Sequence, residues 1–210
     1  EEDIKKTGYV VLATELKHAE KINAHFELTL NSSDKIQCNF LINASGLHTE
    51  EVANRIEEIN LPKIKTVMYA KGHYYLYKKK NPFKHLIYPL PNSNGHGIHA
   101  GMDIENNLRF GPNAKWVDSI EYSFNENTLD EFCNSIKSYW VNFDPSCLTP
   151  DYTGIRSKIV AEGEGSQDFE ILDASDHGLN NFIHLQGIDS PGLTSSLAIA
   201  AEVMSKLGIH

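Results

Sequence analysis

The sequence predicts a mixed α/β fold in which an antiparallel sheet interrupts an α/β domain. Residues 183–207 run from an apolar strand through a Gly/Ser/Pro turn into an Ala-rich helix, and residues 36–56 show a shorter strand-to-helix pattern. Between them, residues 66–110 hold four apolar runs separated by turn formers. Because no helix fits in those connections, the runs are predicted to pair in antiparallel fashion.

The first elements are predicted from a charged opening and two apolar patterns. Residues 1–8 (EEDIKKTG) are typical of the end of a helix that stops at its glycine. The β-rich residues 9–14 predict a strand after it. Apolar residues at every second position from 24 to 30 predict a half-buried strand, and residues 31–34 (NSSD) predict the turn that follows.

The next strand is predicted over residues 36–42. Its apolar end, residues 40–42 (FLI), predicts burial on both faces of a sheet. Small residues at 44–46 (ASG) close this strand, and Thr49 is the expected N-cap of a short helix.

The four strands of the middle segment are predicted at residues 66–77, 85–90, 97–103 and 108–110. A helix follows them, because residues 128–131 (TLDE) match a capping box. Its apolar side chains recur at helical spacing and are expected to pack on the open face of the sheet: Leu129, Phe132, Cys133, Ile136, Tyr139 and Trp140.

The chain then returns through residues 152–156 and a further strand at 169–172. This order is typical of a dinucleotide-binding domain interrupted by a substrate-binding domain. We therefore predict a partial Rossmann-like domain at residues 1–62 and 157–210. An antiparallel substrate-binding domain with one covering helix is predicted at residues 63–156.

The bulk composition is that of an ordinary globular protein and limits its partners. The 210 residues are 40% hydrophobic and 22% charged, with a net charge of −9, which argues against nucleic acid as the main partner. The three cysteines are dispersed, and we expect neither a signal peptide nor a transmembrane segment, so a cytoplasmic location is predicted. The ten histidines show no ligand-type spacing, and no metal is expected.

Short motifs follow one another along nearly the whole chain. They are FLINASGL at 40–47, KGHYY at 71–75, LIYPLP at 86–91, GIH at 97–99, FGPN at 110–113, YTGIR at 152–156 and GIDSPGLT at 187–194. No single motif is specific, but the ordered set resembles the D-amino-acid-oxidase-like family of FAD-dependent oxidoreductases. The L-2-hydroxyglutarate dehydrogenase-like branch is the most similar. This resemblance implies FAD as the cofactor and a partial FAD-binding domain.

The family's Gly-x-Gly-x-x-Gly unit, which binds the FAD pyrophosphate, is not in this sequence. We therefore expect the chain to be the later part of a longer flavoenzyme. The resemblance assigns Ala44, Ser45 and Gly46 to the strand-end turn beside the flavin nucleotide, where small residues let the backbone approach a cofactor. It assigns the segment that faces the flavin ring to Gly187, Ser190, Pro191, Gly192, Leu193 and Thr194.

That second segment also has a physical reason to bind an anion. A turn between a strand and a helix directs unpaired N–H groups and the positive end of the helix dipole to one point. The N–H groups near Leu193 and Thr194 are expected to stabilise negative charge on the reduced flavin ring.

Four residues are candidates for the chemistry. Oxidation of a 2-hydroxy acid needs a base for the hydroxyl proton as hydride moves to flavin N5, and His73 and His99 are the two candidates, between which the sequence does not choose. Arg156 is the expected bidentate clamp for the substrate carboxylate, because its motif resembles the family's arginine segment. Tyr88 is either a hydrogen-bond donor to that carboxylate or a packing residue.

The predicted function is oxidation of a small 2-hydroxy acid such as L-2-hydroxyglutarate. A 2-amino acid is the rival substrate, and it is favoured if both histidines prove dispensable, because an amine can lose its proton without a dedicated base. A truncated, non-catalytic binding module is a third possibility, and a nicotinamide dehydrogenase is a weaker fourth, since there is no phosphate loop. The electron acceptor is unknown, and a homo-oligomer is possible.

Overall fold

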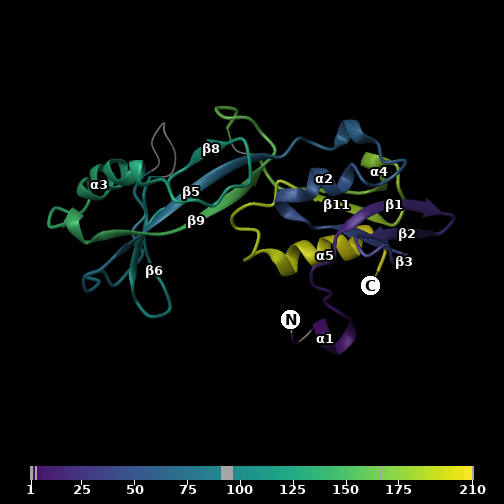
Figure 1. Cartoon of the computed structure of the whole chain (residues 1–210), viewed down its shortest axis with the longest axis horizontal. Coiled ribbons are helices and arrows are strands. Elements are labelled where there is room, and N and C mark those ends of the chain that lie inside the picture. The colour runs from purple at the N-terminus through teal and green to yellow at the C-terminus, as the bar shows by residue number, and fades with distance from the viewer. Residues whose placement is uncertain (1, 3, 91–96, 166, 210) are drawn as a thin grey trace. The chain divides into compact units, whose positions relative to one another are not determined.

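The chain forms two compact units, shown as ribbons in Figure 1. Unit 1 comprises Glu1–Val67 and Gly165–His210, and unit 2 comprises Met68–Glu164. Both units combine helices with sheet, so the predicted mixed α/β class is confirmed. The assignment of cofactor and substrate to separate parts of the chain remains a prediction. The computed structural model describes residues 2, 4–90, 97–165 and 167–209.

The first sheet of unit 1 has the strand order β10–β11–β4. These strands are Glu170–Leu172, Phe182–Gln186 and Leu41–Asn43. β11 runs parallel to β4 and antiparallel to β10. A parallel pair between segments so far apart in the sequence is typical of an α/β domain.

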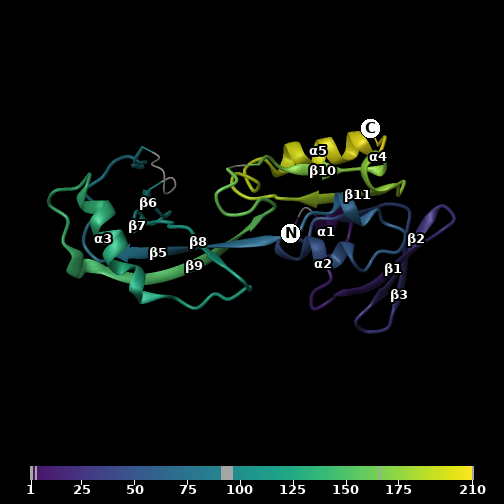
Figure 2. The ribbon, with the colours of Figure 1, turned by 90° about the horizontal axis from the view of Figure 1, so that it is seen from above.

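The second sheet of unit 1 is an antiparallel meander. Its strands are β1 (Leu16–Ile22), β2 (His25–Leu30) and β3 (Lys35–Cys38). Figure 2 shows this meander apart from β10 and β11 within unit 1. The strand and turn predicted over residues 24–34 are confirmed, whereas β1 is an element that the sequence reasoning missed. The core beneath the meander contains Ala19, Phe26, Ile56, Leu179 and Phe182.

Short helices complete unit 1. They are α1 (Ile4–Thr7), α2 (Thr49–Ala53), α4 (Ala174–His177), α5 (Ser196–Lys206) and the 3₁₀ turns η1 (Gly46–His48) and η2 (Leu61–Lys63). The helix end predicted at Gly8 is confirmed, since the Gly8 N–H donates to the Ile4 carbonyl at 2.8 Å. The predicted C-terminal helix is α5. In the described part of the chain, no helix has the length and apolarity that a membrane crossing needs.

The strand predicted at residues 9–14 is wrong. These residues form no strand, and Tyr9 and Leu12 are 94% and 79% exposed. Strand propensity mainly reflects packing against neighbouring strands. The structure provides no such neighbour for this segment.

The strand predicted at residues 36–42 is in fact two strands, β3 and β4, which belong to different sheets. Phe40 and Ile42 are 39% and 42% exposed, so the prediction of burial on both faces is wrong. Thr49 is the first residue of α2 rather than its N-cap. Its hydroxyl donates to the Leu185 carbonyl at 2.7 Å, so a contact with β11 replaces the local cap.

Unit 2 is built on one sheet with β5 at its centre. Its strands are β5 (Met68–Tyr77), β6 (Ala100–Met102), β7 (Leu108–Phe110), β8 (Lys115–Val117) and β9 (Leu148–Lys158). β5 pairs with β9 along one edge and with β7 and β8 along the other, and every pair is antiparallel, as predicted. β8 and β9 are not among the four predicted strands.

The second predicted strand of this sheet, at residues 85–90, is wrong. Ile87 forms an isolated bridge with Ala100 instead. Pro89 has no N–H group to donate, which limits a longer ladder. β6 is shorter than the predicted 97–103. The turn formers at residues 91–95 (PNSNG), which include Pro91 of the LIYPLP motif, lie outside the described residues.

Helix α3 (Leu129–Lys137) covers one face of the sheet, as predicted. Phe132, Cys133 and Ile136 are buried against the strands, whereas Leu129 is 38% exposed. The capping box is not formed, because the Thr128 hydroxyl donates to the Asn125 carbonyl within the 3₁₀ turn η3 (Glu126–Thr128). A further 3₁₀ turn, η4 (Pro145–Cys147), leads into β9.

Candidate active site

The register of β5 and β9 places the candidate residues on two opposite faces of the unit 2 sheet. Arg156 is paired with Ala70, and His73 is paired with Thr153. Directly paired residues share a face, and neighbours along a strand alternate. Arg156 therefore lies on the face opposite to His73. Ala100 is buried in the core beneath α3, so its neighbour His99 is directed to the Arg156 face.

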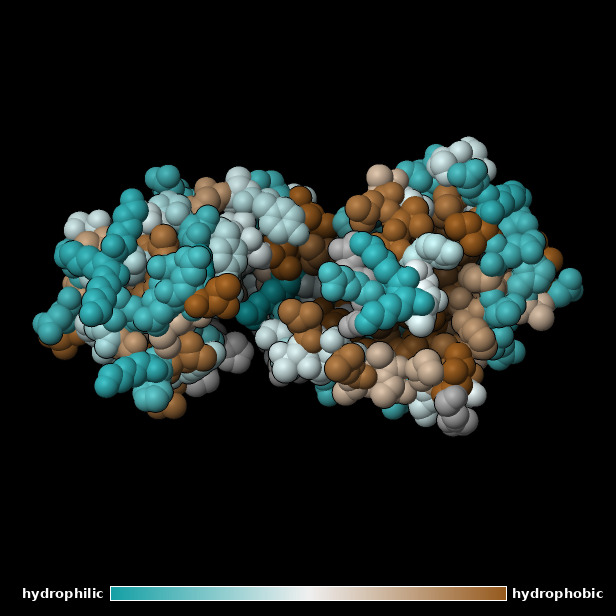
Figure 3. Space-filling model, turned by 90° about the horizontal axis from the view of Figure 1, so that it is seen from below, coloured by the Kyte–Doolittle hydropathy of each residue, from teal (hydrophilic) through white to brown (hydrophobic). Residues whose placement is uncertain are grey.

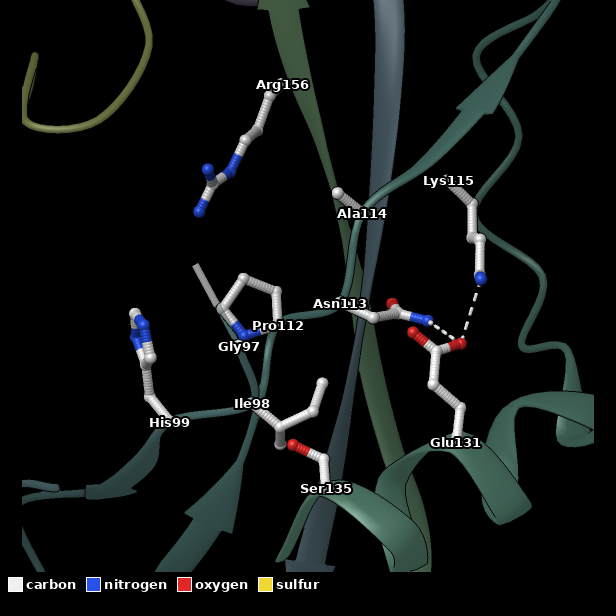
Figure 4. A pocket seen from close by; sticks show the side chains of 10 residues that line it. All are labelled: Gly97, Ile98, His99, Pro112, Asn113, Ala114, Lys115, Glu131, Ser135 and Arg156. Atoms are coloured by element: carbon white, nitrogen blue, oxygen red, sulfur yellow. Dashed lines mark hydrogen bonds and ion pairs between the residues drawn. The ribbon is translucent and has the colours of Figure 1, made fainter. Parts of the chain in front are cut away.

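His99 and Arg156 line one cavity of about 600 Å³ within unit 2. Figure 4 shows the His99 imidazole and the Arg156 guanidinium on the same side of the segment that carries Pro112, with Lys115 and Glu131 on the other side. The remaining lining residues are Gly97, Ile98, Asn113, Ala114 and Ser135.

Tyr88 lies beside this cavity. Its ring centroid is 4.2 Å from that of His99, and its side chain is 62% exposed. The structure therefore brings together three of the four residues predicted for the chemistry, Tyr88, His99 and Arg156, in unit 2.

Gly72 allows two of the lining residues, Pro112 and Asn113, to pack closely on β5. A Cβ atom at this position would lie 2.7 Å from Pro112 Cβ and 3.1 Å from the Asn113 carbonyl oxygen. Only glycine lets the segment at residues 111–114 approach β5 this closely. Glycine is also found directly across the sheet, at Gly154. Apart from its chain neighbours, no described residue has an atom within 4 Å of the place that a Cβ atom of Gly154 would occupy, so the sheet is open beside Arg156 at this position.

His73 is held elsewhere, on the helix-covered face. It is 2% exposed and packs edge-on against Phe124, with ring centroids 5.1 Å apart. Asn113 Oδ1 accepts from the His73 backbone N–H at 2.9 Å and lies 3.1 Å from His73 Nδ1. Because this oxygen only accepts hydrogen bonds, Nδ1 carries the proton and Nε2 does not.

The environment of His73 keeps its ring neutral and away from Arg156. Burial is the main cause that lowers the pKa of His73. Its Nε2 has no partner among the described residues. The His73 side chain lines a second cavity of about 650 Å³, which shares Lys115 and Glu131 with the first but not Arg156. Of the two candidate bases, only His99 shares a cavity with Arg156.

Asn113 is a residue whose role sequence reasoning missed. Besides fixing His73, its Nδ2 lies 3.4 Å from a Glu131 carboxylate oxygen, and Glu131 pairs with Lys115 at 2.9 Å. The FGPN motif marks the position, but the bonds become visible only when residues 111–114 are seen beside β5.

In unit 1, two hydrogen bonds within its own backbone close the turn after β11. The Gly192 N–H donates to the Asp189 carbonyl at 2.5 Å, and the Ser195 N–H donates to the Pro191 carbonyl at 3.0 Å. A Cβ atom at Gly192 would lie 2.6 Å from that Asp189 oxygen, so the turn needs glycine there. Among the described residues, none accepts a hydrogen bond from the N–H groups of Leu193 and Thr194.

An apolar groove of about 480 Å³ lies in unit 1 between this turn, β4 and α5. Four of the predicted cofactor residues line it: Ala44, Gly46, Gly187 and Gly192. Figure 3 shows apolar side chains, in brown, on the visible face of unit 1, at the right of that view. Ser45, Ser190, Pro191, Leu193 and Thr194 are exposed and do not line the groove.

The family model described as FAD dependent oxidoreductase matches residues 3–206 of the chain. The chain belongs to this FAD-dependent oxidoreductase family. The resemblance predicted from the ordered motifs is confirmed, and with it FAD as the cofactor of the family.

The curated relatives include dehydrogenases of two substrate types. A mitochondrial L-2-hydroxyglutarate dehydrogenase of Arabidopsis thaliana is 32% identical over 80% of this chain and 37% of its own length. A glycerol 3-phosphate dehydrogenase of Caloramator mitchellensis is 26% identical over 94% of this chain and 39% of its own length. The chain thus spans less than half the length of either relative.

Solved structures share the fold at lower identity. L-alpha-glycerophosphate oxidase from Mycoplasma pneumoniae with FAD bound has a TM-score of 0.77 and 17% identity, covering 94% of this chain and 50% of that one. Glycine oxidase from Geobacillus kaustophilus has a TM-score of 0.71 and 13% identity, covering 95% of this chain and 50% of that one.

The groove residues of this flavoprotein-family chain fit a flat aromatic group. The lining combines small residues with the apolar side chains of Ile188, Ile199 and Val203. Small residues admit a ring close to the backbone, and apolar side chains cover its faces. The donors of the neighbouring turn are polar groups of the kind that fixes the orientation of such a ligand.

A buried pair, Asn43 and His184, supports the turn at residues 44–46 and was missed by the sequence reasoning. Asn43 Nδ2 donates to the Thr49 carbonyl at 2.8 Å and to His184 Nδ1 at 3.0 Å. Asn43 Oδ1 accepts from the Ser45 hydroxyl at 2.6 Å. His184 Nδ1 is therefore the acceptor, and burial lowers the pKa of His184 to about 4. The sequence signal that could have revealed this pair is a polar residue in each of two apolar strands, Asn43 in β4 and His184 in β11.

Proposed function

We propose that this chain is part of an FAD-dependent dehydrogenase that oxidises a small 2-hydroxy acid, with L-2-hydroxyglutarate as the best-supported substrate. The observation that carries the proposal is the shared cavity of His99 and Arg156. A base and a carboxylate clamp are the two groups that this reaction needs from the protein. The 32% identity with an L-2-hydroxyglutarate dehydrogenase supports the choice of substrate.

In this proposal unit 1 contacts the cofactor. The FAD site is formed by four small residues that line the groove, Ala44, Gly46, Gly187 and Gly192. FAD would supply the hydride acceptor there. The N–H groups at residues 193 and 194 stabilise negative charge on the ring, and one such donor in a dry site is worth about 3 kcal/mol. Ser45 ties the turn at residues 44–46 to Asn43.

Unit 2 is proposed to bind the substrate. Arg156 holds the carboxylate through two parallel N–H donors and thereby fixes the orientation of the Cα–H bond. His99 accepts the hydroxyl proton, the general-base role that histidine fills most often in enzymes. Tyr88 packs beside His99 and restricts the position of the His99 imidazole ring.

Glycerol 3-phosphate is the second candidate substrate. Its support is the 26% identity with a glycerol 3-phosphate dehydrogenase over 94% of this chain. Arg156 suits a phosphate as well as a carboxylate, because both accept a bidentate guanidinium. A 2-amino acid and a non-catalytic binding module are further alternatives, and the assay below distinguishes all of them.

The test is anaerobic bleaching of the flavin absorption band after the purified chain is loaded with FAD. L-2-hydroxyglutarate is expected to bleach it faster than its D-enantiomer, glycerol 3-phosphate or amino acids. His99→Asn should slow bleaching about 10²- to 10⁴-fold, the usual contribution of a general base. Arg156→Lys should lower kcat/KM about 10- to 100-fold, because one charge-assisted hydrogen bond is lost.

His73→Asn is the matched control, because it changes the other candidate histidine on the opposite face of the sheet. It should leave the bleaching rate within a few-fold of wild type once folding is verified by circular dichroism. Bleaching by amino acids that is unaffected by His99→Asn would select the amino-acid alternative. Bound flavin that no candidate substrate bleaches would favour the binding module.

A further inference from the structure

Three potential metal ligands meet on the outer face of the meander in unit 1. His18 and Glu20 lie on β1, and Glu57 follows α2. One ligand atom from each lies within 4.8 Å of the other two, and His18 Nε2 is 3.4 Å from a Glu57 carboxylate oxygen. Residue spacing alone predicts no metal here, because Glu57 comes from a separate segment.

Paired backbone holds these ligands in place. The Ala19 N–H donates to the Arg55 carbonyl at 2.9 Å, and the Glu57 N–H donates to the Ala19 carbonyl at 2.9 Å. Ala19 and Ile56 are 0% and 4% exposed, and a parallel bridge joins them. Because neighbours of a buried strand residue point to the other face, His18 and Glu20 project outward together. Glu57 projects to the same place. Because the backbone of these residues is already ordered, metal binding would cost little further conformational entropy.

The charges around the cluster favour a cation. Glu20 is paired across the sheet with Glu27. Lys35 forms an ion pair with Glu27 and is attracted to Glu20 only at longer range. In the described part of the chain, no lysine or arginine lies within ion-pair distance of Glu20 or Glu57. A divalent ion would neutralise the two carboxylates directly.

We propose that His18, Glu20 and Glu57 bind a divalent transition metal of the Zn²⁺ type. Imidazole nitrogen and carboxylate oxygen are both ligands of Zn²⁺, which also binds at sites with three protein ligands and water in the fourth position. Mg²⁺ and Ca²⁺ prefer oxygen ligands alone and bind here more weakly. The bound ion joins β1 to the segment after α2 and thereby stabilises the packing of the meander.

The experiment is calorimetric titration of the whole chain with Zn²⁺ after chelator treatment, with Mg²⁺ as the comparison ion. One Zn²⁺ site is expected, together with a Zn²⁺-dependent rise in Tm that Mg²⁺ does not reproduce. His18→Ala, Glu20→Gln and Glu57→Gln should each weaken this site at least about 10-fold, since each removes one of three ligands. The two glutamine variants keep the size of the side chain, so they test the site even if His18→Ala fails to fold.

His48→Ala is the matched control. His48 is also at the surface and lies 3.1 Å from a glutamate, Glu51, but the described residues offer that pair no third ligand. Zn²⁺ binding should be unchanged in this variant. The proposal is overturned if wild type binds no Zn²⁺, if the three variants bind it as well as wild type, or if His48→Ala weakens binding as much as His18→Ala.

Discussion

At the scale of single residues, hydrogen-bond partners decide what each histidine can do. His73 donates from Nδ1 to Asn113, whereas His184 accepts at Nδ1 from Asn43. Both rings are buried, and burial lowers the pKa of both. They are therefore neutral near pH 7 and serve as fixed hydrogen-bonding groups. His99, in contrast, lines a cavity together with a cation, which is the setting of a residue that acts on a ligand.

The neutral state of His184 makes stability depend on pH. Its pKa is about 4 in the folded chain and about 6.5 when unfolded. As pH falls from 6.5 toward 4, the unfolded chain takes up a proton that the folded chain does not. The free energy of unfolding therefore falls through this window, by about 3 kcal/mol in total. Above pH 6.5 and below pH 4 this residue adds no further pH dependence.

Urea unfolding at pH 7 and pH 5 measures this effect. His184→Gln is the comparison, because glutamine keeps an acceptor for Asn43 and does not titrate. Wild type should lose about 2 kcal/mol more than the variant between the two pH values. An equal loss in both proteins would show that His184 is already accessible to protons in the folded state.

The sequence motifs predicted which residues lie near the candidate site. They did not predict on which face of the sheet each residue lies. His73 and His99 look equivalent in the sequence, since each sits in an apolar segment of the insert. Their separation depends on the register of β5 with β9 and of β6 with β7. A one-residue shift of either register would exchange the two faces, and single-sequence patterns do not determine register.

At the scale of elements, prediction succeeded where the pattern was local. The spacing of Phe132, Cys133 and Ile136 predicts the buried side of α3, and alternation predicts β2. It failed where distant pairing decides the outcome. Residues 9–14 have strand propensity without a partner, and β8 has a partner in β5 although its own sequence gives little signal.

Helix α3 is predicted to be the main support of the unit 2 core. Phe132 is fully buried and lies against Tyr75, with ring centroids 4.6 Å apart. Phe132→Ala should cost about 3–5 kcal/mol of unfolding free energy, the usual range for a buried phenylalanine. Leu129→Ala, at a position 38% exposed on the same helix, should cost clearly less. Denaturant unfolding of the two variants makes the comparison, and equal losses would contradict the assigned packing.

At the scale of the whole molecule, the two units have separate cores. The unit 1 core contains Ala19, Phe26 and Phe182, and the unit 2 core contains Tyr75, Phe110 and Phe132. Unit 1 is assembled from both ends of the chain, so unit 2 is an insertion into it. The proposed function places the cofactor contacts in unit 1 and the substrate contacts in unit 2. Destabilising one core should therefore affect one of these two functions more than the other.

Damage to each core should have a different functional result. Phe26→Ala removes a fully buried ring from unit 1, and Phe132→Ala removes one from unit 2. If the division is correct, Phe26→Ala weakens FAD retention while the substrate-dependent bleaching of the remaining flavin is preserved. Phe132→Ala should leave the flavin spectrum in place and lower the rate at which L-2-hydroxyglutarate bleaches it, because Ile98, which lines the cavity with Arg156, belongs to the same core as Phe132. FAD retention and the bleaching rate are both measured by absorption spectroscopy below the unfolding temperature of each variant. Loss of flavin from Phe132→Ala alone would show that the cofactor contacts do not lie in unit 1 as proposed.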